Sequence, residues 1–163
     1  MKNLWKDLDS LTSDMKNPID LIREQSNFLT DGTDGVFYFG DTILTKLGTY
    51  TRGVLGQEGI ESKFRYKIDI CSQFLPEYSF NIFNFYYDIT FYPLLMNVPS
   101  EIGEEIEIEG AFCNVDAADV RRYYKIESQE EFEEILCAIF NCEKLRTIMK
   151  NMRAIIGDVA HEE

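Results

Sequence analysis

The sequence has no apolar run long enough to cross a membrane. A transmembrane helix needs about 20 consecutive apolar residues, and the longest candidate, Ile82 to Met96, is interrupted by Asn84, Asp88 and Pro93. Aspartates near the N-terminus also break up any apolar core of the kind that a secretion signal needs. We therefore expect no membrane association and a cytoplasmic location.

Histidine and cysteine are scarce. The single histidine, His161, lies in an Ala-His-Glu-Glu sequence at the C-terminus, where chains commonly fray. The four cysteines (Cys71, Cys113, Cys137 and Cys142) include no Cys-x-x-Cys pair and lack the spacing of a zinc site. A chain of this length does not depend on disulfides. We therefore predict free thiols that pack as small hydrophobic groups, no metal ion and no cofactor.

Basic residues are few and unevenly placed. The chain has 16 Lys and Arg residues against 29 Asp and Glu residues, a net charge of −13, and none of the basic residues lies between Ile68 and Val120. Nine aromatic residues fall within the 19 residues from Phe74 to Tyr92. A platform for stacking nucleic-acid bases combines aromatic residues with cations that follow the phosphates. Because those cations are absent, we interpret the aromatic run as core packing and expect no nucleic-acid partner.

Two helices are predicted before the strands begin. Apolar residues recur at helical spacing in the first dozen residues, at Leu4, Trp5, Leu8 and Leu11. Asn17 followed by Pro18 is typical of a helix start, and the apolar stripe after it predicts a helix from Pro18 to about Leu29. Two Asp-Gly pairs in residues 30–35 then favour a tight turn, because they lack the carboxylate order of a calcium-binding loop.

Alternating apolar and polar residues predict strands in the middle of the chain. Residues 36–73 contain at least two strands, and the glycines between them are assigned to hairpin turns and bulges. Residues 78–89 are largely apolar on both faces, which predicts a central strand. Pro93 places the following strand at an edge or a bulge. Further strands are predicted at residues 104–110 and 120–126.

The C-terminal part is predicted to be helical. Ser128 and Glu131 form the sequence pattern of a capping box, and an apolar stripe from Phe132 to Phe140 follows it. A second apolar stripe runs from Leu145 to Ile156 and is expected to end at Gly157. Two helices separated near residues 141–142 fit this pattern, with one continuous helix as the alternative.

The order of helices, strands and helices predicts a single α+β domain over residues 1–163. A doubly wound nucleotide-binding fold would alternate strands with helices, and no such alternation is present. We expect N-terminal helices, an antiparallel sheet of about five to seven strands and two C-terminal helices packed on the sheet. The ends, at residues 1–12 and 158–163, are expected to fray.

Several short motifs resemble those of a group of small uncharacterised bacterial proteins. Residues 17–25, with Phe28-Leu29 and Thr33, are similar to the Asn-Pro-led helix with a Glu-Gln pair that precedes the sheet in that group. Tyr92-Pro93 resembles a Tyr-Pro pair in its sheet, and residues 128–140 resemble its capped C-terminal helix. The resemblance spans most of the chain. It implies the same fold and no particular activity.

Negative charge is concentrated in the C-terminal half. Residues 101–143 contain 13 acidic and three basic residues, so they carry −10 of the net charge of −13. Acidic surfaces attract cationic proteins, as in immunity proteins and inhibitors. We therefore predict a non-enzymatic protein that recognises a basic protein partner. The predicted contact residues are Glu104, Glu105, Glu107, Glu109, Glu130, Glu131 and Glu134.

Four other hypotheses fit the composition. A strand would place Glu105, Glu107 and Glu109 about 6.6–6.8 Å apart on one face, near the spacing of an inverting glycosidase pair, but a solvated strand has no pocket, so no catalytic residue is assigned. The 22 aromatic residues are compatible with a small-molecule-binding protein or enzyme that has an aromatic-lined pocket. A homo-oligomer joined through an aromatic sheet face is a further hypothesis. The last is that net charge serves only solubility.

Overall fold

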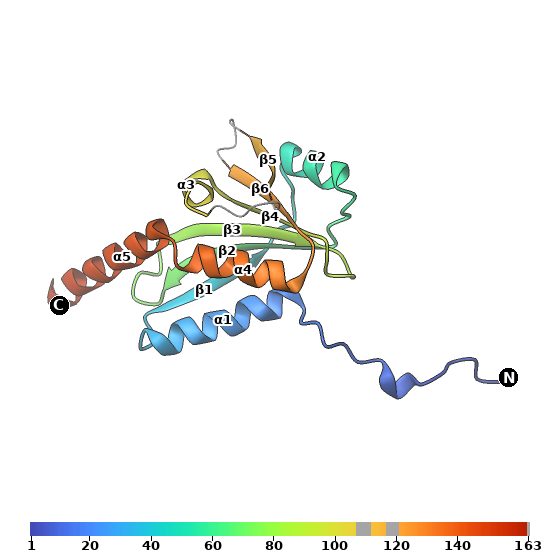
Figure 1. Cartoon of the computed structure of the whole chain (residues 1–163). Coiled ribbons are helices and arrows are strands. Elements are labelled where there is room, and N and C mark those ends of the chain that lie inside the picture. The colour runs from blue at the N-terminus through green and yellow to red at the C-terminus, as the bar shows by residue number, and fades with distance from the viewer. Residues whose placement is uncertain (107–111, 117–120, 163) are drawn as a thin grey trace.

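The protein folds around one antiparallel sheet. A computed structural model describes residues 1–106, 112–116 and 121–162 (Figure 1). Within these ranges the sheet has six strands in the order β1-β2-β3-β4-β6-β5, and the predicted α+β class is confirmed. The strands are β1 Phe37–Ile43, β2 Phe64–Ser72, β3 Ser79–Tyr87, β4 Leu94–Pro99, β5 Phe112–Asp116 and β6 Arg121–Ile126. The helices are η1 Leu8–Ser10, α1 Pro18–Gly32, α2 Thr49–Gln57, α3 Ser100–Gly103, α4 Gln129–Phe140 and α5 Glu143–Glu162.

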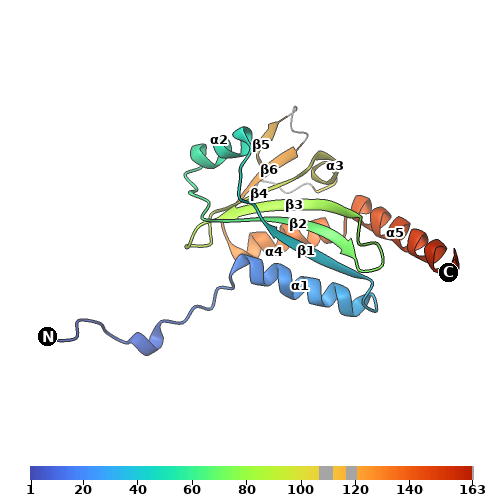
Figure 2. The same cartoon turned by 180° about the vertical axis from the view of Figure 1, so that it is seen from behind.

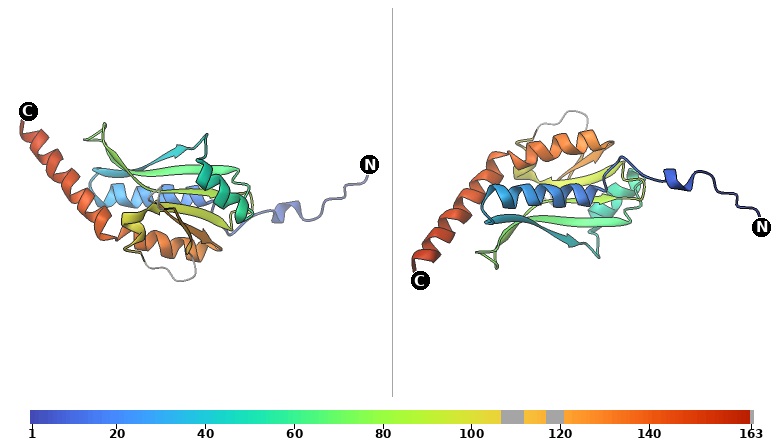
Figure 3. Two further views of the ribbon diagram at one scale, coloured as in Figure 1. Left: turned by 90° about the horizontal axis from the view of Figure 1, so that it is seen from above. Right: turned by 90° about the horizontal axis from the view of Figure 1, so that it is seen from below.

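One face of the sheet is covered by α1 and α4, which lie side by side (Figures 1 and 3). The rings of Phe85 and Phe132 are 5.8 Å apart, so β3 and α4 are in direct aromatic contact. Six of the nine residues of the aromatic run pack here, three of them buried and three partly buried. Tyr86 is buried on the other face, and Phe74 and Tyr78 remain 52% and 46% exposed, so the prediction of core packing is confirmed for seven of the nine. Because helices cover this aromatic face, it is not available as an interface between copies. Its buried residues include Ile19, Ile22, Phe83, Phe85, Tyr87, Phe132, Ile135 and Ile139.

The other face of the sheet is partly covered by α2 (Figure 2). The sequence predicts hairpin turns in this glycine-bearing segment, and that prediction is wrong, because Thr49–Gln57 is helical. A glycine in a helix costs about 1 kcal/mol relative to alanine, whereas burying an aliphatic side chain contributes about 1.5–3 kcal/mol. Val54 and Leu55 are both buried in a cluster with Tyr86 and Tyr123. Tertiary packing therefore outweighs the low helix propensity of the two glycines in α2.

The start of α1 is as predicted, but its expected cap is absent. The side chain of Asn17 forms no capping hydrogen bond. Its Oδ1 atom instead accepts a hydrogen bond from the hydroxyl group of Tyr87. Asn17 therefore ties the beginning of α1 to the end of β3. After α1, Asp34 and Gly35 adopt positive φ angles of 53° and 81°, which form the predicted turn.

The strand after Pro93 lies inside the sheet, not at its edge. β4 pairs with β3 on one side and with β6 on the other. Pro93 lies one residue before Leu94, where β4 begins, so its missing N–H group removes no hydrogen bond from the ladder. The edge prediction is therefore wrong. Leu94, Leu95 and Met96 are completely buried, because helices cover both faces of the strand.

The N-terminal segment is not the amphipathic helix that its apolar spacing predicts. Regular structure there is limited to the single 3₁₀ turn Leu8–Ser10, and the segment extends away from the sheet (Figures 1 and 2). Leu4, Trp5 and Leu11 are each more than 70% exposed. An isolated helix of this length is marginal in water without a surface to pack on, which explains the difference.

The C-terminal part forms two helices, as the preferred alternative predicts. The Ser128 hydroxyl oxygen accepts a hydrogen bond from the Glu131 N–H group at 3.2 Å. The Glu131 carboxylate in turn accepts from the N–H group of Glu127, at 2.8 Å, one residue earlier than in a standard capping box. The expected end at Gly157 is wrong, because α5 continues to Glu162. One glycine costs only about 1 kcal/mol in a helix of this length.

Buried tyrosines make the fold sensitive to alkali. Burial raises the pKa of Tyr92 to about 12 and also raises the pKa values of Tyr86, Tyr87 and Tyr124. The hydroxyl group of Tyr92 is buried with no hydrogen-bond partner among the described residues.

We therefore expect the fold to be lost cooperatively at alkaline pH. The neutral phenols favour the folded state, so their contribution is complete below the unfolded-state pKa of about 10 and disappears as pH rises towards about 12. Phenolate absorbance from the four tyrosines with raised pKa values, Tyr86, Tyr87, Tyr92 and Tyr124, should appear in the same transition as the loss of the circular dichroism signal. Phenolate formation by all nine tyrosines near pH 10 (the unfolded-state value, about 10) in an intact fold would contradict this expectation.

Candidate functional site

The predicted acidic strand at residues 104–110 is not found where the structure describes it. Glu104 and Glu105 lie in a turn directly after α3, and this part of the strand prediction is wrong. Gly103, the last residue of α3, lies directly against Arg122 of β6, because a Cβ atom on it would be 2.5 Å from Cδ of that side chain. This close approach fixes where the chain turns after α3. Glu107 and Glu109 lie outside the described residues. Ile106, directly after the turn, is buried and only 4% exposed.

Glu105 caps α5. Its two carboxylate oxygens accept hydrogen bonds from the N–H groups of Glu143 and Lys144, at 2.7 and 2.9 Å. Both N–H groups belong to the first turn of α5, where a negative charge is also favoured by the helix dipole. Nearby, Glu101 forms an ion pair with Lys144 and raises the pKa of that amine. These carboxylates therefore stabilise the junction between α3 and α5.

The solvent-facing side of α4 carries carboxylates without partners. Glu130 and Glu134 are exposed, and within the described ranges neither forms an ion pair or a side-chain hydrogen bond. Their spacing of four residues puts them on one face of the helix. The helix α4 contains no Lys or Arg. We call this surface, which comprises Glu130, Glu133 and Glu134, the acidic α4 face.

The five predicted contact residues that the structure describes do not form one compact patch. Gln129, at the start of α4, accepts a hydrogen bond from the backbone of Lys16 just before α1. Glu105 lies at the start of α5, beyond the other end of α4. Because α4 ends at Phe140, about 15 Å of helix separates that end from Glu130, and about 9 Å separates it from Glu134. Glu130, Glu131 and Glu134 belong to one group, and Glu104 and Glu105 belong to the other.

At the C-terminal end of α4 lies an apolar groove that sequence reasoning missed. It is formed where α1, α4 and the start of α5 meet, and it has a volume of about 310 Å³. The rings of Phe39 and Phe140 stack 5.0 Å apart at its base, and Phe28 at its rim is 62% exposed. Arg146 also lines the groove and donates a hydrogen bond to the side chain of Asn141. We call this the α1–α5 groove.

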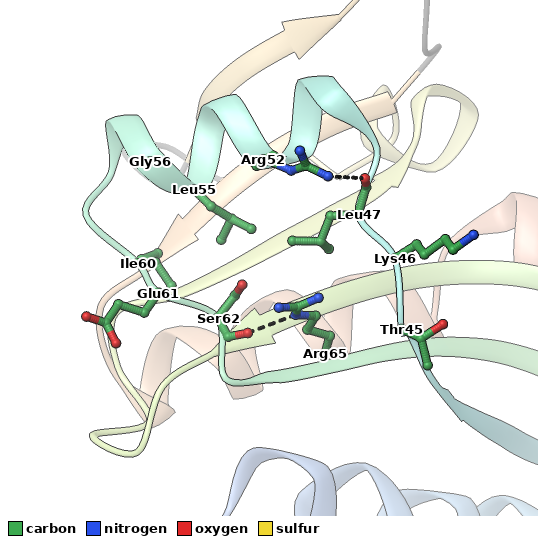
Figure 4. A pocket seen from close by; sticks show the side chains of 10 residues that line it. All are labelled: Thr45, Lys46, Leu47, Arg52, Leu55, Gly56, Ile60, Glu61, Ser62 and Arg65. Carbon is green, nitrogen blue, oxygen red and sulfur yellow. Dashed lines mark hydrogen bonds between the residues drawn. The ribbon is translucent and has the colours of Figure 1, made fainter.

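A second missed feature is a cationic pocket beneath α2 (Figure 4). It has a volume of about 520 Å³ and lies between α2, the segment before it and the start of β2. Lys46, Arg52 and Arg65 line it together with one acidic residue, Glu61. The clue in the sequence is a local reversal of charge, because residues 44–67 contain five basic and two acidic residues in an otherwise acidic chain.

A polar network lies on the same face of the sheet. Asn97, which is 1% exposed, donates a hydrogen bond to the hydroxyl group of Tyr86 and accepts one from Nε of Arg121. Thr51 of α2 shares a hydrogen bond of 2.8 Å with the Tyr123 hydroxyl group. Burial raises the pKa of Tyr86, so this phenol stays neutral at ordinary pH. The network attaches α2 to the sheet and satisfies its buried polar groups.

In the described part of the chain, we find neither an activated thiol nor a cluster of metal ligands. Cys71, Cys137 and Cys142 are free. Burial raises the pKa values of Cys71 and Cys142, which disfavours the reactive thiolate form. Across residues 1–106, 112–116 and 121–162, no three His, Cys, Asp or Glu side chains gather as metal ligands would.

The described helices include none with the length and hydropathy needed to span a membrane.

The cap on α5 makes Glu105 and Glu104 separable by mutation. We expect Glu105→Ala to lower the free energy of unfolding by about 0.5–2 kcal/mol, the usual range for a lost helix cap. The matched control is Glu104→Ala, which removes an exposed neighbouring carboxylate and should change stability by less than about 0.5 kcal/mol. Urea unfolding followed by circular dichroism measures both. Equal effects of the two substitutions would show that Glu105 acts only through its charge.

Comparison of the chain with models of known protein families, with curated proteins and with solved structures finds no match. The resemblance to small bacterial proteins stays a prediction.

Proposed function

We propose that this protein is a non-enzymatic binding protein that recognises a basic protein partner through the acidic α4 face and the α1–α5 groove. The observation that carries the proposal is that α4 carries two unpaired carboxylates, Glu130 and Glu134, and forms at its C-terminal end an apolar groove with an exposed phenylalanine. Protein interfaces commonly combine an apolar anchor with a polar or charged rim.

The two parts of this surface have different physical roles. Glu130, Glu133 and Glu134 attract a cationic partner over distances of about a Debye length, which speeds association and is weakened by salt. The groove accepts an apolar side chain and supplies affinity through burial. A second groove between α1 and α4, of about 290 Å³, lies next to Glu133 and shares Gln25 and Phe140 with the first. The partner therefore presents Lys or Arg side chains around an apolar anchor.

The structure changes which predicted residues belong to the proposed contact surface. Glu130 and Glu134 remain in it, and Glu133 joins them. Glu105 and Glu131 are left out because their carboxylates accept hydrogen bonds from the backbone at helix starts. Glu104 is exposed but belongs to the turn after α3 and lines neither of the two grooves.

Charge reversal on α4 should abolish partner binding. We expect the double variant Glu130→Lys/Glu134→Lys to lose a stoichiometric basic protein that the unaltered chain retains in affinity capture from its own cell extract. High salt should release the same protein from the unaltered chain, because the attraction is screened. Mass spectrometry identifies the retained protein.

The matched control is Asp9→Lys/Glu77→Lys, which makes the same change in net charge at exposed positions in the N-terminal segment and in the turn between β2 and β3. It should retain the partner. A second variant, Phe28→Ser, should weaken capture without loss of stability, because Phe28 is mostly exposed. Retention by all variants, or equal loss from the control, would overturn the proposal and leave net charge with a role in solubility alone.

A further inference from the structure

Positive charge gathers on the opposite side of the molecule from the acidic α4 face. Residues 44–67 carry a net charge of +3 in a chain of net charge −13. This segment includes the chain before α2, α2 itself and the start of β2. In Figure 1, α2 and α4 lie on opposite sides of the sheet. The cationic pocket is therefore independent of the surface in the proposed function.

Two guanidinium groups come to the pocket from two different elements. Arg52 extends from α2 and Arg65 from β2, whereas Lys46, on the segment between β1 and α2, lines the pocket with its amine directed away from both (Figure 4). The Nε atom of Arg65 donates to the backbone oxygen of Ser62 at 2.9 Å, and Arg52 donates to the backbone oxygen of Leu47 at 3.4 Å. These carbonyl contacts hold both side chains in place and leave their positive charge unneutralised.

The one carboxylate on the pocket rim does little to offset this charge. Glu61 is 3.8 Å from the amine of Lys63, with both side chains mostly exposed. Arg52, Arg65 and Lys46 form no ion pair within the described residues. The field inside the pocket is therefore positive, although the protein as a whole is strongly negative.

Ser62 adds a hydroxyl group to the pocket. The residue is 2% exposed, and its side chain points from the pocket wall towards α2 (Figure 4). Among the described residues, the enclosed side-chain atom without a partner is the hydroxyl oxygen of Tyr92. The Ser62 hydroxyl group forms no hydrogen bond among these residues, so it is open to the pocket. The φ angle of Ser62, 54°, is in the left-handed region, a conformation that serine seldom adopts and that commonly occurs at functional sites.

The rest of the pocket wall is apolar. Leu55 and Ile60 are buried beneath α2, and Leu47 is half-buried beside them. A ligand that fills the pocket therefore meets cations and a hydroxyl donor on one side and aliphatic side chains on the other. The volume of about 520 Å³ is in the range of small-molecule sites.

We propose that this pocket binds a small phosphate monoester that has an apolar substituent. Guanidinium groups match the oxygens of a phosphoryl group, and the two guanidinium groups of Arg52 and Arg65 suit a dianion better than the single charge of a carboxylate. The Ser62 hydroxyl group donates to the same phosphoryl group, and the apolar substituent lies against Leu47, Leu55 and Ile60.

Phenyl phosphate is the probe that tests the assignment, with binding measured by calorimetry on the full chain. It should bind, and both inorganic phosphate and benzoate should bind at least about tenfold more weakly. Inorganic phosphate lacks the apolar substituent, and benzoate lacks the phosphoryl group. If inorganic phosphate bound equally well, the pocket would not recognise the apolar substituent. If benzoate bound equally well, the pocket would not recognise the phosphoryl group. If phenyl phosphate did not bind at millimolar concentration, which corresponds to a weak small-molecule affinity, the proposal would be overturned.

Two variants locate the site. Arg52 is exposed on α2, so Arg52→Gln should leave the fold intact and weaken phenyl phosphate binding about tenfold or more, as expected for a lost charge-assisted hydrogen bond. Ser62→Gly removes the hydroxyl group at a φ angle that glycine adopts readily, and it should weaken binding severalfold. The control Lys150→Gln removes one exposed cation on α5 and should change nothing. Equal binding by all three would contradict the site, whatever the outcome of the partner-capture experiment.

Discussion

Burial of the central strands on both faces is the constraint on which the rest of the structure depends. In β3, Phe85 and Tyr87 belong to the cluster beneath α1 and α4, whereas Tyr86 between them belongs to the cluster beneath α2. In β4 the same division separates Leu94 and Met96 from Leu95. Strands that are apolar on both faces need two covering layers. The segment between β1 and β2 must therefore cross the second face and pack there, and it does so as α2 despite its glycines.

The two covering layers carry different charged surfaces. The outer side of α4 is acidic and has no cation of its own, and an apolar groove lies at its C-terminal end. The layer on the other face contributes Arg52 to a pocket that Arg65 also lines. The acidic α4 face and the cationic pocket thus lie on opposite sides of a buried sheet. A surface for a basic protein and a pocket for a small anion are compatible in one small domain because they do not compete for the same residues.

Local patterns in the sequence predicted the elements whose own residues decide their structure. The apolar stripe after Asn17-Pro18, the alternation in β2, the two-sided strand β3 and the cap at Ser128 were all identifiable. Patterns failed where a distant contact decides the outcome. The Thr49–Gln57 helix depends on packing against Tyr86 and Tyr123, and the turn at Glu104 and Glu105 depends on the side chain of Arg122 and on the start of α5. The acidic half was visible as composition, but the cap formed by Glu105 and the pocket beneath α2 required the fold.

The separation of the two charged surfaces is the central claim, and backbone amide NMR of the whole chain tests it most directly. Titration with phenyl phosphate should shift the amide signals of the chain around Lys46, Arg52 and Ser62 and leave those of α4 unchanged. Titration with a short lysine-rich peptide that contains one apolar side chain should shift signals of α4 and the C-terminal end of α1 and leave those of α2 unchanged. Shifts of the same residues by both probes, or shifts spread evenly over the acidic surface, would contradict the account.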